Sequence, residues 1–322
     1  MSLETHPTHS PGGAARDDND FSRLSHGRHP HRGFTIGSYR QPPPMLFTRD
    51  GHNAFLGDIY RGHAAFLICS GPSLEKHNLS LLNQRGVLTM SVNNAAAVYR
   101  SQLWCSVDEP GNFCDAIWYD PGILKFVPLS QMEKRFRVRS EGGDLLESAQ
   151  LQLVGDMPAV FGYRRNESFV AEQWLYEDSF NWGNHGQIVD ADGNKGGRSV
   201  MYVAIRLLFF LGVRRVYLLG CDFRMKEGER NYAFEQDRTA SSVRGNNASY
   251  DILNARLRRL LPYFEREHFE IYNCTADSGL TVFPQMSFED ALAASTSIMP
   301  KSIVTAGMYD RRQHVEEPAA VA

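Results

Sequence analysis

Short apolar runs, separated by polar segments rich in glycine, recur along the chain between about residue 45 and residue 300. Each run is four to eight residues long, and apart from Glu270 in the last one the runs contain no Lys, Arg, Asp or Glu. Such runs are typical of strands buried on both faces of a sheet. A half-exposed strand would instead alternate apolar and polar residues. The predicted strands cover residues 63–70, 86–93, 103–107, 216–219 and 269–272.

Helical periodicity appears between these runs. Residues 74–83 predict a short helix, and residues 198–211 predict a longer one with Ser199 close to its start. Residues 250–264 place leucines at helical spacing, and 288–294 form another short helix. Buried strands alternating with helices favour an α/β class, here a Rossmann-like, mostly parallel sheet with flanking helices and a polar lid loop.

The pattern also divides the chain. Residues 1–45 are rich in Gly, Pro, His, Ser, Asp and Arg, and such a segment buries too little apolar surface to offset its ordering entropy. We therefore expect a disordered tail over 1–45 and a single α/β domain over 46–299. A less regular insertion is expected at about 110–193, and a peripheral tail over 300–322.

Composition narrows the class further. Hydrophobic residues make up 42% and charged residues 22%, and the formal net charge of −3 argues against a broad basic face for nucleic acid. The five cysteines contain no C-x-x-C pair, which disfavours a zinc site and fits a reducing compartment. The longest apolar stretch is too short to span a bilayer, so a cytoplasmic protein without a membrane span is expected.

The first candidate site is the loop Gly71-Pro72-Ser73 between a buried strand and a helix. Ligands of open α/β sheets bind beyond the carboxyl ends of strands, and unpaired N–H groups at a helix start suit phosphate. Gly71 would let the backbone approach the ligand, Pro72 would fix the turn, and Ser73 would cap the helix or donate to phosphate. A tight turn without a ligand is the alternative.

Polar residues also follow the next two predicted strands. Asn93 ends the second strand and could bond a ribose or a base, although Asn favours turns by itself. Asp108 and Glu109 follow the third strand and could hold ribose hydroxyls or a divalent metal. A solvated turn before Pro110 is the alternative.

A fourth group begins after the strand at 216–219. Asp222 follows this strand directly, and Arg224 and Tyr232 lie on the glycine-containing polar loop behind it. Such a loop could close over a phosphate and stabilise charge on a leaving group. Asp190 and Asp192 have the spacing of a metal-binding acid pair, but Asp-x-Asp-Gly is also a common turn, so no metal site is predicted.

Taken in order, these segments resemble a known family. FLICSGPSL at 66–74, SVNN at 91–94, the helix–strand unit at 198–223, NYAF at 231–234 and NCTADSGL at 273–280 are similar to bacterial sialyltransferases of glycosyltransferase family 42. They also resemble a related group of motility-associated flagellin glycosyltransferases and archaeal 6-hydroxymethylpterin pyrophosphokinases. The resemblance covers about 66–108 and 195–292, and it implies a GT-A-type variant of the Rossmann-like fold.

The resemblance also implies roles for individual residues. The family's loop and an asparagine bind CMP at the positions of Gly71, Pro72, Ser73 and Asn93. The segment before the long helix lines the nucleotide site at Arg198 and Ser199. Of two tyrosines that stabilise the departing phosphate, one matches Tyr232 and the other is replaced by Arg224.

One departure concerns the family's general-base histidine, whose place falls near Asn246. An amide cannot take a proton at neutral pH. Asp222, Asp237 and His185 are the alternative proton acceptors.

Three functions remain open from the sequence. The leading one is transfer of a sugar from a nucleotide-sugar donor, of the CMP-sugar type, to a hydroxyl acceptor such as a glycan, a protein or a modified nucleobase, with no cofactor required. The second is pyrophosphoryl transfer from ATP to a pterin alcohol, which would need Mg²⁺. The third is non-catalytic binding of a nucleotide or glycan. Family members often form homo-oligomers, so one is an expectation here.

Overall fold

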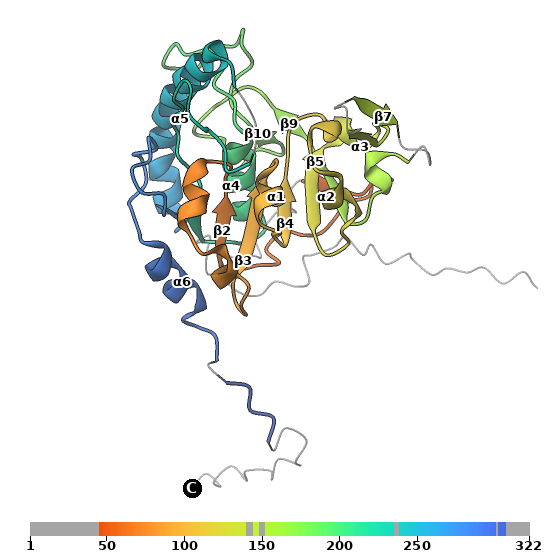
Figure 1. Cartoon of the computed structure of the whole chain (residues 1–322), viewed down its shortest axis with the longest axis vertical. Helices are drawn as coiled ribbons and strands as arrows, with labels where there is room; N and C mark the ends of the chain where they lie inside the picture. The colour runs from red at the N-terminus through yellow and green to blue at the C-terminus, as the bar shows by residue number, and fades with distance from the viewer. Residues whose placement is uncertain (1–44, 140–143, 148–151, 235–237, 301, 307–322) are drawn as a thin grey trace, which may run out of the picture.

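The computed structural model describes residues 45–139, 144–147, 152–234, 238–300 and 302–306. Its centre is an eight-stranded sheet in which every neighbouring pair is parallel except the edge pair β1–β8 (Figure 1). The α/β class and the Rossmann-like, mostly parallel sheet with flanking helices are confirmed. In spatial order the strands are β1 (Leu46–Phe47), β8 (Val160–Tyr163), β5 (Leu124–Pro128), β4 (Leu103–Cys105), β3 (Leu88–Val92), β2 (Ala64–Ile68), β11 (Arg215–Leu219) and β12 (Glu270–Asn273).

The inner strands are buried on both faces, as their continuous apolar runs predict. On β2, Leu67 belongs to the core on one face of the sheet, whereas Phe66 and Ile68 belong to the core on the other. The first face is covered by α4 (Val200–Phe210) and α5 (Ala240–Arg266). The second face is covered by η3 (Pro72–Lys76), η4 (Leu79–Leu82), α1 (Ala95–Val98) and α6 (Phe288–Thr296).

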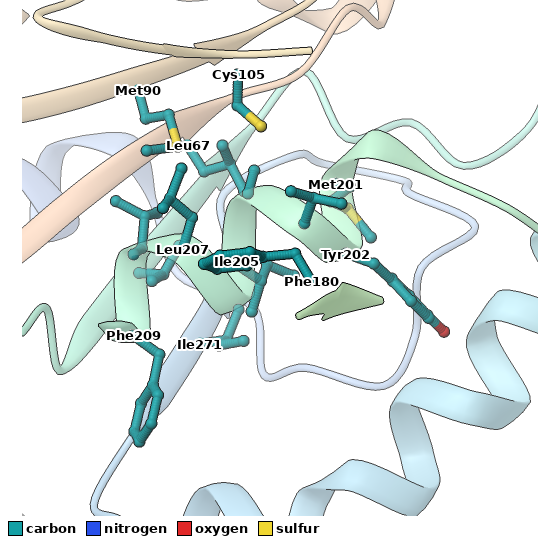
Figure 2. Packing of buried hydrophobic residues seen from close by; sticks show 14 of the residues in the cluster. Leu67, Met90, Cys105, Phe180, Met201, Tyr202, Ile205, Leu207, Phe209 and Ile271 are labelled. Atoms are coloured by element: carbon teal, nitrogen blue, oxygen red, sulfur yellow. The ribbon is translucent and has the colours of Figure 1, made fainter. Parts of the chain in front are cut away.

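Helix α4 forms the centre of the larger core (Figure 2). Nine of its eleven residues are buried, and Figure 2 shows Met201, Ile205 and Leu207 close to Leu67 and Met90 of the sheet. Deleting one such side chain to Ala would cost about 2–5 kcal/mol, because a close-packed core collapses only partly into the space left. The helix therefore fixes the sheet strands whose ends carry the candidate site.

Two helix predictions need correction. Residues 74–83 do not form one helix but belong to the two 3₁₀ turns η3 and η4. The Asn78 side chain accepts hydrogen bonds from the Ser80 N–H and hydroxyl, and these local bonds compete with a continuous helix at this point. Helix α5 begins at Ala240, ten residues before the start of the helix predicted at 250–264. Its first turns are solvated, with Val243 as their buried residue, so they lack the apolar stripe that marks a helix in sequence.

The middle of the chain contributes more to the sheet than its irregular sequence indicates. Strands β5 and β8 extend the central sheet, and α2 (Asp115–Tyr119), α3 (Leu129–Met132) and Trp104 enclose a third core cluster there. Short two-stranded pairs complete the segment. They are β6 (Arg137–Arg139) with β7 (Leu145–Glu147), and β9 (Arg165–Asn166) with β10 (Phe180–Asn181).

The predicted tails at 1–45 and 300–322 lie mostly outside the described residues. Across the described part of the chain, no helix is both long enough and apolar enough to traverse a lipid bilayer.

The order of the strands points to the functional edge of the sheet. From β2 the chain runs outward through β3, β4, β5 and β8, and it then returns to build β11 and β12 on the other side of β2. The direction of winding thus reverses between β2 and β11. In open α/β sheets, ligands bind at the carboxyl ends of the strands beside such a reversal.

Candidate functional site

A cavity of about 790 Å³ lies at the carboxyl ends of β2, β3 and β4. Small-molecule sites in proteins are usually about 300–1,000 Å³, so the cavity can hold a ligand the size of a nucleotide. Its walls are rich in amides, carboxylates and hydroxyls, and therefore suit a polar ligand. The lining residues are Ser70, Asn93, Asn94, Asp108, Asn112, Phe113, Cys114, Asp115, Tyr232, Phe234 and Arg238.

Asn93 occupies the end of β3 in a strained conformation. Its φ is 47°, in the left-handed region that few residues other than glycine adopt. The backbone is held there because its N–H donates to the Cys105 carbonyl at 3.1 Å and its carbonyl accepts from Trp104 Nε1 at 2.8 Å. Among the described residues, no donor reaches the buried side-chain oxygen Oδ1. The Asn93 amide oxygen is therefore available to a ligand in the cavity.

The neighbouring Asn94 has a different task. Its Nδ2 donates to the Asn112 carbonyl at 3.0 Å, and its Oδ1 accepts from the Cys114 N–H at 3.3 Å. These two bonds fasten the turn at 112–114 to the end of β3. One wall of the cavity is thus positioned by the residue beside the candidate ligand group.

Asp108 follows β4 and lines the same cavity. Desolvation of its carboxyl raises the pKa of Asp108 above its ordinary value, and the negative charge of Glu109 adds to this effect. The positive charges of Arg165, Arg198 and Arg238 act in the opposite direction. Three cations from separate parts of the chain therefore surround one carboxylate, which makes this end of the cavity favourable for an anion.

Tyr232 and Arg238 also line the cavity. The Arg238 Nε donates to the Tyr232 hydroxyl at 3.1 Å, and its guanidinium lies 5.2 Å from the centre of the tyrosine ring. Phe234 stacks on the same ring at 5.3 Å. Because the tyrosine oxygen accepts from Arg238, its own O–H is left to donate into the cavity. Sequence reasoning identified Tyr232 and missed Arg238, although the position of Arg238 on the same polar loop was the available signal.

The segment bearing Tyr232 is anchored to the glycine loop. The Ala233 N–H donates to the Ser70 carbonyl at 2.9 Å, at the end of β2. Arg230 donates to the Ala233 carbonyl at 2.8 Å and pairs with Glu75 of η3 at 2.6 Å. The segment that carries Tyr232 and the glycine loop are therefore fastened to each other at the cavity.

The glycine loop uses its donors internally. The Ser73 N–H and hydroxyl both donate to Asp222 Oδ2, at 3.4 and 2.7 Å, and the Gly71 N–H donates to the Gly220 carbonyl at 2.8 Å. Gly71 is needed for this close approach, since a Cβ there would overlap the Asp222 carboxylate. Gly71, Pro72 and Ser73 stand behind the cavity lining, and the preceding Ser70 reaches the cavity instead.

The remaining predicted residues lie around this centre. The Ser199 hydroxyl accepts from the Met201 N–H at 3.1 Å and thereby caps α4. The guanidinium groups of Arg198 and Arg165 each lie 4.7 Å from the Trp182 ring, and both arginines pair with Glu167. Arg224 is exposed and does not line the cavity.

Two of the three sequence candidates for a proton acceptor, Asp222 and His185, do not line the cavity. Asp222 is engaged with Ser73, and His185 is exposed with its Nδ1 accepting from the Gln187 N–H. Asp237 lies outside the described residues. The amide of Asn246 donates to the Met225 sulfur at 3.2 Å and so packs against the loop after β11.

Asp190 and Glu109 are engaged in structural ion pairs. Asp190 is fully buried, accepts from Arg256 at 2.7 Å and closes its own turn by accepting from the N–H groups of Asp192 and Asn194. Glu109 pairs with Lys134. In the described ranges, no group of three or more His, Cys, Asp or Glu side chains is arranged to hold a metal ion.

Comparison with known proteins gives distant similarities. No family model and no curated protein matches the sequence. A mammalian sialyltransferase in complex with Gal-beta-1-3GalNAc-ortho-nitrophenol matches with 10% identity and a TM-score of 0.31, over 61% of this chain and 67% of that one. The sialyltransferase CST-II in complex with trisaccharide acceptor and CMP matches with 14% identity and a TM-score of 0.32, over 70% and 86% of the two chains. Similarity this distant assigns neither a family nor an activity.

Proposed function

We propose that this protein is a glycosyltransferase that transfers a sugar from a nucleotide-sugar donor, of the CMP-sugar type, to a hydroxyl-bearing acceptor. The observation that supports it most is the meeting of two features in one cavity. The buried Asn93 Oδ1 is an unpaired acceptor, and Tyr232 and Arg238, which line the same cavity, present hydrogen-bond donors and positive charge. A nucleotide offers matching groups, namely amino or hydroxyl donors at one end and phosphate at the other.

Each feature would act on a different part of the donor. Asn93 would accept from the amino group of the base or from a ribose hydroxyl, and this bond would satisfy an otherwise unpaired buried oxygen. Tyr232 and Arg238 would bond the phosphate as negative charge develops on it. Donors already in position at a leaving group stabilise the transition state more than the ground state. Arg238 therefore takes the role that the sequence assigned to Arg224.

The loop at 71–73 and the residues near α4 would support the site. Ser73 and Asp222 join the ends of β2 and β11, so they would hold Ser70 and the Tyr232 segment at a fixed separation. Arg198 contributes positive charge near Asp108, as the electrostatics of that carboxyl indicate.

The first experiment is a thermal-shift titration with CMP, CDP, UDP, GDP and ATP, each with and without Mg²⁺. A ligand that binds only the folded state raises the melting temperature by mass action. At a ligand concentration one hundred times Kd, the free energy of unfolding increases by about 2.7 kcal/mol. We expect a shift with CMP that needs no metal. A shift with ATP that requires Mg²⁺ would favour pyrophosphoryl transfer instead. The absence of a shift with every nucleotide would contradict the proposed function.

A further inference from the structure

Transfer of a sugar to a hydroxyl requires a group that removes the hydroxyl proton, and the cavity offers few such groups. None of the described residues that line it is a histidine. Cys114, Tyr232 and Arg238 offer hydrogen-bond donors to the cavity. The carboxylates of Asp108 and Asp115 are the remaining candidates.

The two carboxylates differ in what surrounds them. Asp115 lies in the first turn of α2, where an acidic side chain stabilises the start of a helix. Asp108 follows the end of β4, and among the described residues no hydrogen-bond donor or ion-pair partner contacts its carboxylate. The next residue, Glu109, is already paired with Lys134. The lone pairs of Asp108 are therefore available to a ligand.

We infer that Asp108 is the general base of the proposed transfer, a role that rests on the proposed function and goes beyond the nucleotide contact expected from the sequence. The acceptor oxygen forms a bond to the anomeric carbon of the sugar, while the bond from that carbon to the phosphate oxygen breaks. The leaving phosphate keeps that electron pair. The hydroxyl proton passes to the Asp108 carboxylate, and the charge left on the phosphate is stabilised by Tyr232 and Arg238, which line the same cavity.

The electrostatics of Asp108 support this role. Desolvation raises its pKa, and a carboxylate with a raised pKa is a stronger base than an ordinary aspartate. The charged groups that face it are Arg165, Arg198, Arg238 and Glu109, and the three arginines limit the rise. The acid limb of the rate profile should therefore report a group that titrates above the usual value of about 3.9.

The test uses Asp108→Asn, with Asp178→Asn as the matched control, because Asp178 is an exposed aspartate that pairs with Arg164 and does not line the cavity. Release of CMP from a panel of CMP-sugars can be followed with water as the acceptor, because water must also lose a proton. Asp108→Asn should lower kcat by about 10²–10⁴-fold, change the KM for the donor less than about threefold, and abolish the acid limb of the pH profile. Asp178→Asn should keep all three close to wild type, and Asp115→Asn tests the competing carboxylate.

Several results would overturn the inference, and they are distinguishable from failure of the proposed function. If Asp108→Asn loses the CMP thermal shift and raises KM while kcat persists, Asp108 binds the nucleotide and is not the base. If Asp115→Asn has the larger loss of kcat, the role belongs to Asp115. A wild-type protein that binds CMP but releases none from the donor panel would also exclude the assignment. Failure of the wild type to bind any nucleotide would instead remove the function itself.

Discussion

At the scale of single residues, Asn93 combines two costs that a protein normally avoids. Its backbone is in the left-handed region, and its buried amide oxygen has no donor in the described part of the chain. Strain of this kind costs on the order of 1–3 kcal/mol and persists where surrounding contacts hold it. Here those contacts are the bonds from Trp104 and to Cys105, which point the side chain at the cavity.

This arrangement predicts that binding and stability can be separated at Asn93. Asn93→Gly removes the amide but tolerates the positive φ, so stability should change by less than about 1 kcal/mol while CMP affinity falls about tenfold. Asn93→Ala removes the amide and cannot relax the strain, so it should lose both. Thermal melts with and without CMP measure the two effects. Equal losses of stability in both variants would contradict the role of the backbone strain.

Arg238 gives a second prediction at this scale. Arg238→Leu removes the charge beside Tyr232 and should weaken CMP binding at least about tenfold, because a charge-assisted bond contributes about 1.5–3 kcal/mol. The matched control is Arg244→Leu, which removes an exposed arginine of α5 that pairs with Glu227 and does not line the cavity. Calorimetric titration with CMP compares them. If both variants lose affinity equally, the loss reflects net charge and not a contact.

At the scale of elements, α4 joins the core to the site. Its first turn is capped by Ser199, whose hydroxyl accepts from the Met201 N–H, and its buried residues pack on the sheet. The resemblance placed Ser199 in the nucleotide site, whereas the structure uses its side chain at the helix start.

The cap predicts a stability effect at Ser199. Ser199→Ala should destabilise the protein by about 0.5–2 kcal/mol, because the first turn of α4 loses a hydrogen-bond acceptor. Ser199→Asp keeps an acceptor at the cap and is the control that should retain most of the stability. Urea unfolding measures both. A loss of CMP binding in Ser199→Ala without a loss of stability would favour the nucleotide contact instead.

Elements with a strong apolar pattern could be predicted from the sequence. The buried runs of β2, β3 and β11 are unbroken, and α4 has Ser199 at its start, so each was found within a few residues. The start of α5 was missed because its solvated turns have no apolar stripe. The break at Asn78 depends on a local side-chain bond that competes with a helix and leaves no periodic signal.

The candidate site was predictable in part for a similar reason. Asn93, Asp108 and Tyr232 end strands or follow a recognisable segment, and all three line the cavity. Arg238 and Asp115 also line the cavity, but neither directly follows a strand, so the apolar pattern of the sequence does not predict their positions. The Ser73–Asp222 bond was also out of reach, because it joins residues 149 positions apart.

At the scale of the whole molecule, the outer part of the sheet contains a buried charge. Lys125 of β5 is fully buried, and its Nζ donates to the carbonyls of Asp120, Ile123 and Pro158 at 2.6, 3.1 and 2.7 Å. Burial lowers the pKa of Lys125 from 10.5 to about 8. The lysine thus links the turn before β5 to the segment that leads into β8.

The depressed pKa gives a prediction for the pH dependence of folding. Between about pH 8 and about pH 10.5 the unfolded chain binds more protons at Lys125 than the folded protein does. The destabilising effect of the buried lysine on the folded state therefore becomes smaller as the pH rises. Relative to Lys125→Met, the wild type should gain free energy of unfolding across this window, by no more than about 1.4 kcal/mol per pH unit. Below about pH 8 the difference should be flat. Urea unfolding of both proteins at several pH values tests this, and a gain with falling pH would contradict it.

The bond between Ser73 and Asp222 joins the ends of β2 and β11, two neighbouring strands that are far apart in sequence. This separation affects the order in which the chain folds. Strands β2, β3, β4 and β5 are near neighbours in sequence and can pair early, whereas β11 can dock on β2 only after the intervening segment has been made. Closure of that long loop carries an entropic cost that local pairing avoids. We therefore expect the edge of β2 to stay open during synthesis until β11 arrives. In refolding experiments, the amide protons of β11 and the Tyr232 segment should become protected later than those of β3 and β4.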